Sequence, residues 1–314
     1  MLRKYGVTCG FLTEACINAR QNNTTSNINL TFIDYLQDVG MTNIQTELHL
    51  GRYYYDIYLP DINTIIELNP TISHTCIETG IYLPREEYYH YFKTKYAQDN
   101  GYRCINVWDW DNWSDIISMI MPKEKLYARK LQLKEISKQE ANIFLNEYHL
   151  QNSCRGNSVN IGLFDNDNQL IQVMTFGKPR YNKNYQWELL RLCSHSSYIV
   201  IGGAERLFKY FIKNYNPESI ISYCDLSKFS GSVYERLGFT KYNIINPSKI
   251  WSKDSEHITQ NLLNKYGFDI LIGSKLSPPE LYGKGTDNNM LMLSHKWLPV
   301  YDCGQQMYNW KIKT

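Results

Sequence analysis

A chain of 314 residues is too long for one ordinary domain, so two domains of roughly 150 residues each are expected. Hydrophobic residues make up 43% of the chain and charged residues 20%, which excludes a wholly disordered protein. The formal charge of +2 excludes a uniformly basic nucleic-acid binder, so any affinity for nucleic acid must come from local basic patches.

The cysteine pattern and the hydropathy indicate a reduced compartment. The 8 cysteines form no CxxC pair, which argues against a structural zinc site and favours buried thiols. No stretch of about 18 apolar residues occurs, and polar residues interrupt residues 1–20 every few positions. We therefore expect a soluble protein of the cytoplasm with no membrane partner.

The first half of the chain predicts a helix, three strands, a second helix and a fourth strand. Phe32, Leu36 and Val39 share one helical face, and Gly40 is a stop signal for that helix. The predicted elements, in chain order, are the helix 31–39, the strands 44–50, 53–59 and 62–68, the helix 85–99 and the strand 102–108. We place the first domain at residues 1–120.

The second half predicts an antiparallel meander followed by a β-α-β-α-β pattern. Its predicted elements are the helix 139–150, the strands 160–167, 169–178 and 187–195, a glycine turn and helix over 200–215, the strand 218–225, the helix 230–237 and the strand 239–245. The lysine-rich stretch 121–139 predicts a linker, and residues 140–250 the second domain. Signals are weak in residues 251–314, which we expect to pack on the second domain as an extension.

Two carboxylates interrupt the best strand-like runs of the first half, Asp56 in YYYDIYL and Glu67 in INTIIEL. A buried ionised carboxylate needs a cation or hydrogen bonds. Two acids on adjacent strands would attract Mg²⁺, which could activate water and stabilise the charge on a scissile phosphate. His74 lies close enough in the chain to act as general acid or base. An exposed hairpin with solvated acids fits the spacing equally well.

The surrounding text resembles phage and bacterial nucleases of the very-short-patch-repair type, a group that includes homing endonucleases of the EDxHD kind. The resemblance covers about residues 25–118 and rests on DIYLPDINTIIELNPTISH and YHYFKTKYAQDNGYRCINVWDWD. It implies an α/β domain of the PD-(D/E)XK fold, Mg²⁺ as cofactor and double-stranded DNA as substrate. The site residues that it implies are the metal ligands Asp56 and Glu67, the catalytic His74, Asn69 of the E-x-N turn, and Asp109 or Asp111 as the final acid.

The sequence departs from this pattern at one position. A glutamate usually lies on the helix ahead of the strands, but Asn29 stands at that place in SNINLTFIDYL. Asparagine can orient water but adds no charge to a metal site. Glu47 or Glu14 are alternatives for the missing acid, and a domain that binds DNA without cutting it is a further one.

Glycines mark a possible cofactor site in the second half. Gly202, Gly203 and Ala204 lie where a strand meets a helix, and backbone N–H groups at such a helix start can hold a pyrophosphate. An ordinary helix start explains the same residues. Residues 160–240 nevertheless resemble the GNAT acyltransferase fold, and more closely the DNA-modifying enzymes of the Mom type, through GLFDNDNQLIQVMTFGK, ELLRLCS, GGAERLFKYF and YCDLSKFSGSVYERLGF.

This second resemblance implies a GNAT-like α/β domain with an acyl-CoA-type ligand. Tyr234 matches the tyrosine that protonates the leaving thiolate, and Asp225 matches an acid of the Mom-type motif. Ile199 stands where acyltransferases usually carry Arg or Gln, which argues against ordinary acetyl-CoA binding. Packing of the Tyr234 ring beside Leu237 and Phe239, and capping of the next helix by Asp225, are the alternatives.

Basic residues form two candidate DNA contacts. Lys93 and Lys95 lie on the helix that the nuclease resemblance places along the DNA backbone. In the second half, HLQNSCRG and KPRYNK predict a patch of phosphate contacts with an aromatic side chain among them, made by Arg155, Lys178, Arg180, Tyr181 and Lys183. A solvated loop explains each short run taken alone.

The leading hypothesis is a Mg²⁺-dependent DNA endonuclease whose GNAT-like domain positions or recognises DNA. A Mom-type acyltransferase that modifies DNA bases is the second hypothesis, and a non-catalytic DNA-binding protein is the third. Double-stranded DNA is the partner in all three.

Overall fold

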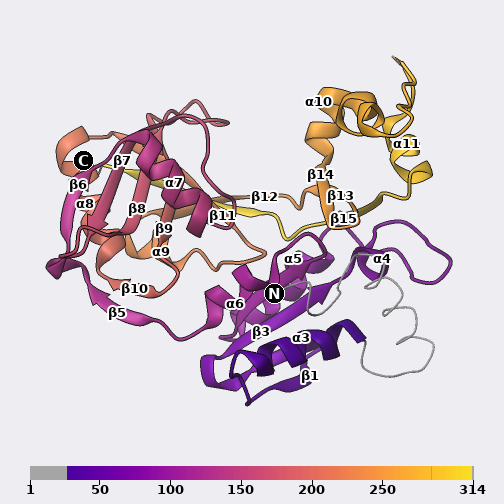
Figure 1. Cartoon of the computed structure of the whole chain (residues 1–314), viewed down its shortest axis with the longest axis horizontal. Coiled ribbons are helices and arrows are strands. Elements are labelled where there is room, and N and C mark those ends of the chain that lie inside the picture. The colour runs from indigo at the N-terminus through magenta and orange to yellow at the C-terminus, as the bar shows by residue number, and fades with distance from the viewer. Residues whose placement is uncertain (1–26, 284, 313–314) are drawn as a thin grey trace. The chain divides into compact units, whose positions relative to one another are not determined.

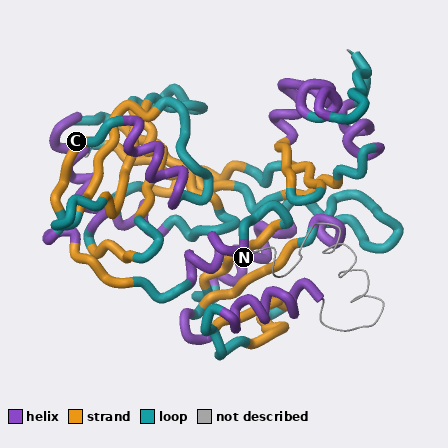
Figure 2. Tube along the Cα trace, in the orientation of Figure 1, coloured by secondary structure: helices purple, strands orange, loops and turns teal. Residues whose placement is uncertain are grey.

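The structure is a computed structural model that describes residues 27–283 and 285–312 (Figure 1). The described chain has a mixed α/β fold, with helices and strands throughout (Figure 2). It divides into two compact units, and each is built from separate stretches of sequence. Of the described residues, the first unit draws on 27–116, 225–230 and 246–304 without 284, and the second on 117–224, 231–245 and 305–312.

The first unit is built on a sheet with the order β1-β2-β3-β4. Its helices and strands are α3 (Asn27–Asp38), β1 (Gln45–Leu50), β2 (Tyr53–Leu59), β3 (Thr64–Asn69), the short α4 (Thr71–His74), α5 (Tyr89–Asp99) and β4 (Arg103–Trp108). The first two pairs are antiparallel, and β3 pairs with β4 in parallel. A parallel pair needs a long crossover, which α5 supplies. All six residues of β3 are buried, as expected of the interior strand that joins both kinds of pairing.

Residues 246–304 add a second layer of structure to this unit. They form the three-stranded sheet β14-β13-β15 and two helices, with the bounds β13 (Lys249–Lys253), β14 (Glu256–Thr259), α10 (Gln260–Leu271), α11 (Asn288–Ser294) and β15 (Leu298–Tyr301). Trp251, Phe268 and Met292 form the centre of their own apolar cluster. The carbonyl of Pro299 accepts hydrogen bonds from the Thr75 hydroxyl at 2.7 Å and from Cys76 N at 2.9 Å. The predicted extension on the second domain is therefore wrong for most of its length.

The second unit contains a sheet of seven strands in the order β12-β16-β11-β9-β8-β7-β6. Its strands are β6 (Gln132–Glu135), β7 (Asn157–Phe164), β8 (Leu170–Gly177), β9 (Trp187–Ser194), β11 (Ser219–Asp225), β12 (Thr240–Ile245) and β16 (Gln305–Lys311). The strands β6 to β9 pair antiparallel in sequence, which confirms the predicted meander, and β11 then pairs in parallel with β9.

The remaining elements of this unit and of its boundary are the helices α6 (Trp113–Ile120), α7 (Lys138–Tyr148), α8 (Gly203–Tyr215) and α9 (Ser232–Arg236), and the two-stranded sheet of β5 (Glu124–Tyr127) and β10 (Tyr198–Ile201). The lysine-rich stretch 121–139 is not a linker. It supplies β5 and β6, because its apolar residues Leu126, Leu131 and Leu133 pack against the core while its lysines face outward.

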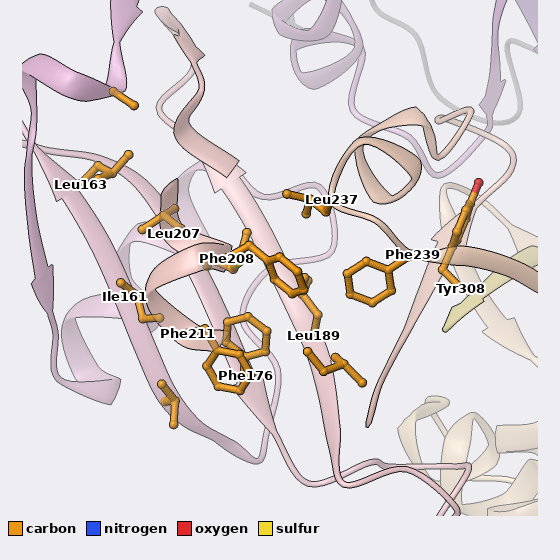
Figure 3. Close-up of a cluster of buried hydrophobic side chains, with 14 of the residues drawn as sticks. Ile161, Leu163, Phe176, Leu189, Leu207, Phe208, Phe211, Leu237, Phe239 and Tyr308 are labelled. Atoms are coloured by element: carbon orange, nitrogen blue, oxygen red, sulfur yellow. The ribbon is translucent and has the colours of Figure 1, made fainter. Parts of the chain in front are cut away.

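Aromatic side chains form the core of the second unit (Figure 3). The rings of Phe176 on β8 and Phe211 on α8 are stacked with their centroids 3.5 Å apart, and Phe208 packs against Phe239 at 5.3 Å. Phe176 and Phe211 are fully buried, and each such pair adds about 0.5–1.5 kcal/mol beyond area burial. This core fixes α8 on the sheet, so the start of α8 is held at the end of β10.

Of the helices in residues 27–283 and 285–312, none has the length and apolar character needed to cross a lipid bilayer.

The stretch YDCGQQMYNW contains a buried acid that organises a turn. One oxygen of Asp302 accepts hydrogen bonds from Ser248 N at 2.7 Å and Gly304 N at 2.8 Å. Burial outweighs these bonds and raises the pKa of Asp302 to about 7. The turn is thereby held by a carboxyl group that prefers its protonated form.

This acid predicts a dependence of stability on pH. The folded-state pKa of Asp302 lies above the ordinary value, so its contribution is fully present below about pH 4 and is lost as the pH rises through about 7. Asp302→Asn should keep both hydrogen bonds, because an amide oxygen can accept them. It should also remove part of this pH-dependent loss of the free energy of unfolding. Denaturant unfolding across that range should therefore give a flatter pH profile for Asp302→Asn. The control variant Asp254→Asn, at an exposed position, should match the parent protein; identical profiles for all three proteins would contradict the assignment.

Candidate functional site

Asp56 on β2 and Glu67 on β3 lie together and bond to each other's strand. The Asp56 backbone N–H donates to Glu67 Oε1 at 3.0 Å, and the Leu68 N–H donates to Asp56 Oδ2 at 2.8 Å. The antiparallel register, which pairs Ile57 with Ile66, brings the two carboxylates to the same place. The sequence prediction that these two acids share one site agrees with this geometry.

Lys93 on α5 reaches the same site. Its Nζ forms an ion pair with Glu67 Oε2 at 2.5 Å, and its side chain is only 10% exposed. Burial lowers the pKa of Lys93, but the carboxylates of Glu67 and Asp56 outweigh that effect and raise it. Lys93 therefore remains a cation inside the site. Its ammonium is paired with Glu67, and its contact with DNA phosphates stays a prediction. Lys95 is exposed and pairs with Asp99 on the same helix at 2.7 Å.

Burial dominates the protonation of both acids. It raises the pKa of Glu67 to about 7, and the attraction of Lys93 does not offset it. It also raises the pKa of Asp56, against Lys93 and the Leu68 N–H, with a further small increase from Glu47. One ammonium thus leaves the pair of carboxylates incompletely neutralised.

Asn29 occupies the position next to Asp56. It lies on α3, is 9% exposed, and its Nδ2 donates to Asp56 Oδ1 at 3.4 Å. An acid at residue 29 would therefore stand beside Asp56. Of the two alternatives, Glu47 is exposed on β1 and close enough to act on the pKa of Asp56, and Glu14 lies outside the described residues.

Two N–H donors surround the Asp56 carboxylate. They are the Asn29 amide, at 3.4 Å from Oδ1, and the Leu68 backbone, at 2.8 Å from Oδ2. Mg²⁺ commonly takes one or two carboxylates and completes its shell with water and phosphate oxygens. Both carboxylates are already engaged within the chain, because Glu67 and Asp56 each accept N–H donors on both of their oxygens. Within the described part of the chain, no three His, Cys, Asp or Glu side chains converge to hold a metal ion.

The other predicted residues of this half gather at the ends of β3 and β4. Asn69 Nδ2 donates to Asn106 Oδ1 at 3.0 Å, and Asp109 Oδ2 accepts from Thr71 N at 2.7 Å. His74 on α4 stacks on His90 of α5, with ring centroids 5.0 Å apart. Among the described residues, no hydrogen bond joins His74 to Asp56 or Glu67, so the acids and the histidine are neighbouring clusters rather than one bonded network.

The alternative final acid has a structural partner. Asp111 Oδ2 accepts the Trp108 N–H at 2.8 Å and forms an ion pair with Lys228, whose ammonium also contacts the Asn106 carbonyl. Lys228 lies far from Asp111 in the sequence, and no local sequence pattern predicted that the two residues would pair. Asp109 is therefore the acid placed with Thr71 and Asn69, while Asp111 fixes the loop after β4.

In the second unit, the glycine turn is covered by the chain itself. Gly202 has a left-handed backbone with a φ of 75°, and a Cβ on Gly203 would meet the Gln172 side chain at 2.0 Å. The Arg206 guanidinium donates to the carbonyls of Ala128 and Leu131, the latter at 2.7 Å. Gly202 is thus required by its left-handed backbone and Gly203 by close packing, as an ordinary helix start explains, and residues 128–131 lie against the start of α8.

Tyr234 and Asp225 have local roles in packing and turn formation. The Tyr234 ring stacks on Tyr308 at 4.8 Å and meets Phe239 edge-on at 5.8 Å, and its hydroxyl donates to the Tyr223 carbonyl at 3.4 Å. Burial raises the pKa of Tyr234 to about 12, so it keeps its proton. The Asp225 carboxylate accepts Ser227 N at 2.8 Å, which closes a turn before α9 rather than capping that helix.

The basic patch of the second unit is divided. Asn157 pairs with Gly177, so the exposed Arg155 and Lys178 flank the same end of the β7–β8 pair. Arg180 instead donates three hydrogen bonds to the fully buried Glu188, two from its guanidinium at 2.9 and 2.7 Å and one from its backbone. The ion pair with Glu188 is the main role of Arg180, which differs from the predicted phosphate contact.

Comparisons with known proteins identify no family for this chain. No protein-family model matches it, and no curated protein matches it. Among solved structures, it is similar to an inferred acetyltransferase from Acinetobacter baylyi, with 13% identity and a TM-score of 0.33 over 59% of this chain and 94% of that one. A spermidine/spermine N-acetyltransferase from Vibrio cholerae, in complex with manganese ions, has 10% identity and a TM-score of 0.34 over the same shares. These values are too low to assign a fold or an activity to this chain.

The contact between Asn29 and Asp56 predicts how an added acid would behave. Asn29→Asp should lower the free energy of unfolding in chelator by about 1–3 kcal/mol, because it buries a third carboxylate beside two others. Mn²⁺ should then raise the melting temperature of this variant more than that of the parent protein. Gln37→Glu, which adds the same charge at an exposed position of α3, is the control and should show neither effect. An equal response to Mn²⁺ in all three proteins would contradict a cation site at Asp56.

Proposed function

We propose that the first unit binds double-stranded DNA and hydrolyses its phosphodiesters, as an endonuclease. The observation that carries this proposal is the cluster of the buried Glu67 and Lys93 with the partly buried Asp56, in the same unit as the partly buried His74. A structural core would avoid two acids and a lysine at this depth, because buried ion pairs rarely add net stability.

The residues suggest a division of labour. Asp56, beside Asn29, would hold Mg²⁺, which when bound supplies positive charge to a phosphate and acidifies a bound water. Lys93 holds Glu67 in place, and Glu67 in turn fixes the backbone N–H of Asp56. These contacts pre-orient the Asp56 carboxylate before any ligand arrives.

His74 would act as the general base of the reaction. Burial, with smaller contributions from His90, Arg85 and Lys93, lowers the pKa of His74 well below its ordinary value. The ring is therefore neutral at physiological pH and can accept a proton from an attacking water. A residue in this role typically contributes about 10²–10⁴-fold to the rate.

Cleavage of supercoiled DNA tests the proposal directly. Asp56→Asn should reduce nicking or cutting by at least about 100-fold, because it removes the charge that binds the cation while keeping the shape of the side chain. Asp61→Asn, at an exposed acid in the turn after β2, is the matched control and should cut like the parent protein. Cleavage that survives Asp56→Asn would contradict the site, and DNA binding without any cleavage would select the non-catalytic alternative.

We also propose acyl transfer to DNA by the second unit as a second candidate function. A specific observation favours it: the parallel strands β9 and β11 lie side by side in the sheet but pair at only two positions, Trp187 with Ile220 and Glu188 with Ile221. Beyond these positions the carbonyls of Leu189 and Leu190 accept from the Ser222 and Arg191 side chains, both at 2.9 Å, and an extended ligand could bind the backbone groups that remain. Tyr234 is protonated beside Tyr223 of β11 and could donate a proton to a leaving thiolate. Ile199 and the covered start of α8 argue against an ordinary pyrophosphate grip.

Mass spectrometry of nucleosides tests this second candidate. DNA incubated with the protein and a series of acyl-CoA donors should gain the mass of one acyl group per modified base. Tyr234→Phe should lower the yield by about tenfold or more, because it removes the proton donor. Tyr242→Phe, at an exposed tyrosine of β12, should leave the yield unchanged. Unmodified nucleosides with every donor would remove this candidate and leave the nuclease proposal untouched.

A further inference from the structure

Four polar groups around His74 are buried without a partner. They are Arg85 Nε, His90 Nε2, His74 Nδ1 and Thr71 Oγ1, and none of them has a hydrogen bond to the described residues. A buried polar atom left unsatisfied costs about 1–3 kcal/mol. Four such atoms in one place are more than a packed core normally contains, so they indicate a site that a polar ligand completes.

The four groups belong to one cluster in the first unit. The rings of His74 and His90 stack at 5.0 Å. The Arg85 guanidinium lies over the Tyr89 ring at 4.5 Å from its centroid, and that ring is 5.0 Å from His90 and 6.3 Å from His74. Thr71 and His74 share the single turn of α4. The residues that carry the unpartnered atoms therefore come from α4, α5 and the segment that precedes α5, and the rings of His74, Tyr89 and His90 lie together.

The charge and donors of this cluster select an anion. Arg85 is a permanent cation, and its guanidinium fork is suited to a phosphate or carboxylate. Burial first, and then Lys93 and Arg85, lower the pKa of His90 to about 3, so both imidazoles are neutral and each has one N–H to donate. Thr71 adds a hydroxyl donor. A tetrahedral oxyanion can accept hydrogen bonds from all of these groups.

The cluster is rigidly supported. The Arg85 backbone N–H donates to the Thr75 carbonyl at 2.9 Å, and the Thr75 hydroxyl donates to Pro299 on β15 at 2.7 Å. His90 is 1% exposed and also meets Trp108 edge-on at 4.9 Å. Donors held in this way lose little freedom when a ligand binds, which favours binding over nonspecific attraction.

We propose that Arg85 and His90, together with Thr71, form a pocket that holds a phosphate group of the DNA backbone next to His74. The identity of the ligand as a DNA phosphate rests on the proposed nuclease function. The binding chemistry of the pocket does not, because the same donors would bind any phosphate group. Arg85 and His90 contact the phosphate oxygens, and His90 also holds the ring of His74 by stacking. Neither residue had been given a role from the sequence, although both lie in or beside the YHYFKTK helix.

Titration of the full-length protein with inorganic phosphate tests the pocket. The imidazole NMR signals of His74 and His90 should shift together as phosphate is added, and Arg85→Ala should weaken the apparent affinity at least tenfold. Arg85→Lys should lose less, because it keeps the charge but not the fork. Arg129→Ala, at an exposed arginine of the second unit, should bind phosphate like the parent protein. Equal phosphate responses in the parent protein and Arg85→Ala would overturn the proposal.

Binding to a DNA duplex of about 20 base pairs separates this proposal from the nuclease function. Arg85→Ala should make the slope of log K, the DNA association constant, against log salt concentration less negative by about one. This is the change expected for the loss of one phosphate contact. DNA cleavage by the parent protein with an unchanged slope in Arg85→Ala would remove the pocket and keep the nuclease. An Arg85-dependent phosphate response without DNA binding would keep the pocket and remove the nuclease. If Arg85→Ala fails to fold, the same phosphate and DNA titrations can be made on His90→Asn, which retains an N–H donor at this position.

Discussion

The ion cluster of Lys93, Glu67 and Asp56 is the constraint on which the first unit depends. A single ammonium from α5 is buried against carboxylates from two strands, and the carboxylates bond in turn to each other's backbone. Removing one partner of a buried pair typically costs about 3–5 kcal/mol, because the other charge remains buried. The position of α5 across the sheet, and with it the position of His90, follows from this cluster.

The same cluster explains why this part of the molecule suits chemistry better than packing. Its acids are under-neutralised, its neighbouring histidines are neutral, and several donors around them are unsatisfied. Each of these features lowers stability in the absence of a ligand. Together they are the features from which we proposed a phosphate pocket and a nuclease function for this unit. In the second unit, by contrast, the predicted ligand groups are engaged in packing, as with Gly203 against Gln172 and Arg180 against Glu188.

Sequence patterns were sufficient where a signal was local. The alternation in residues 53–59 gave β2 with the same bounds, and the apolar run after Gly101 gave β4 to within one residue. The glycine pair at residues 202 and 203 marked the start of α8 correctly. Patterns failed where the partner was distant. Lysines in residues 121–139 looked like a linker because nothing local shows that β5 pairs with β10 and β6 with β7.

The sequence by itself predicted the strands that carry Asp56 and Glu67 and a hairpin that could bring the two acids side by side, with solvated acids on an exposed hairpin as an equal alternative. Only the tertiary structure decided that Lys93 turns inward, that His74 stacks on His90, and that residues 246–304 group with the first unit. These contacts join segments far apart in the chain, and their energies depend on burial and on the charges around them. Local propensity carries no information about either quantity.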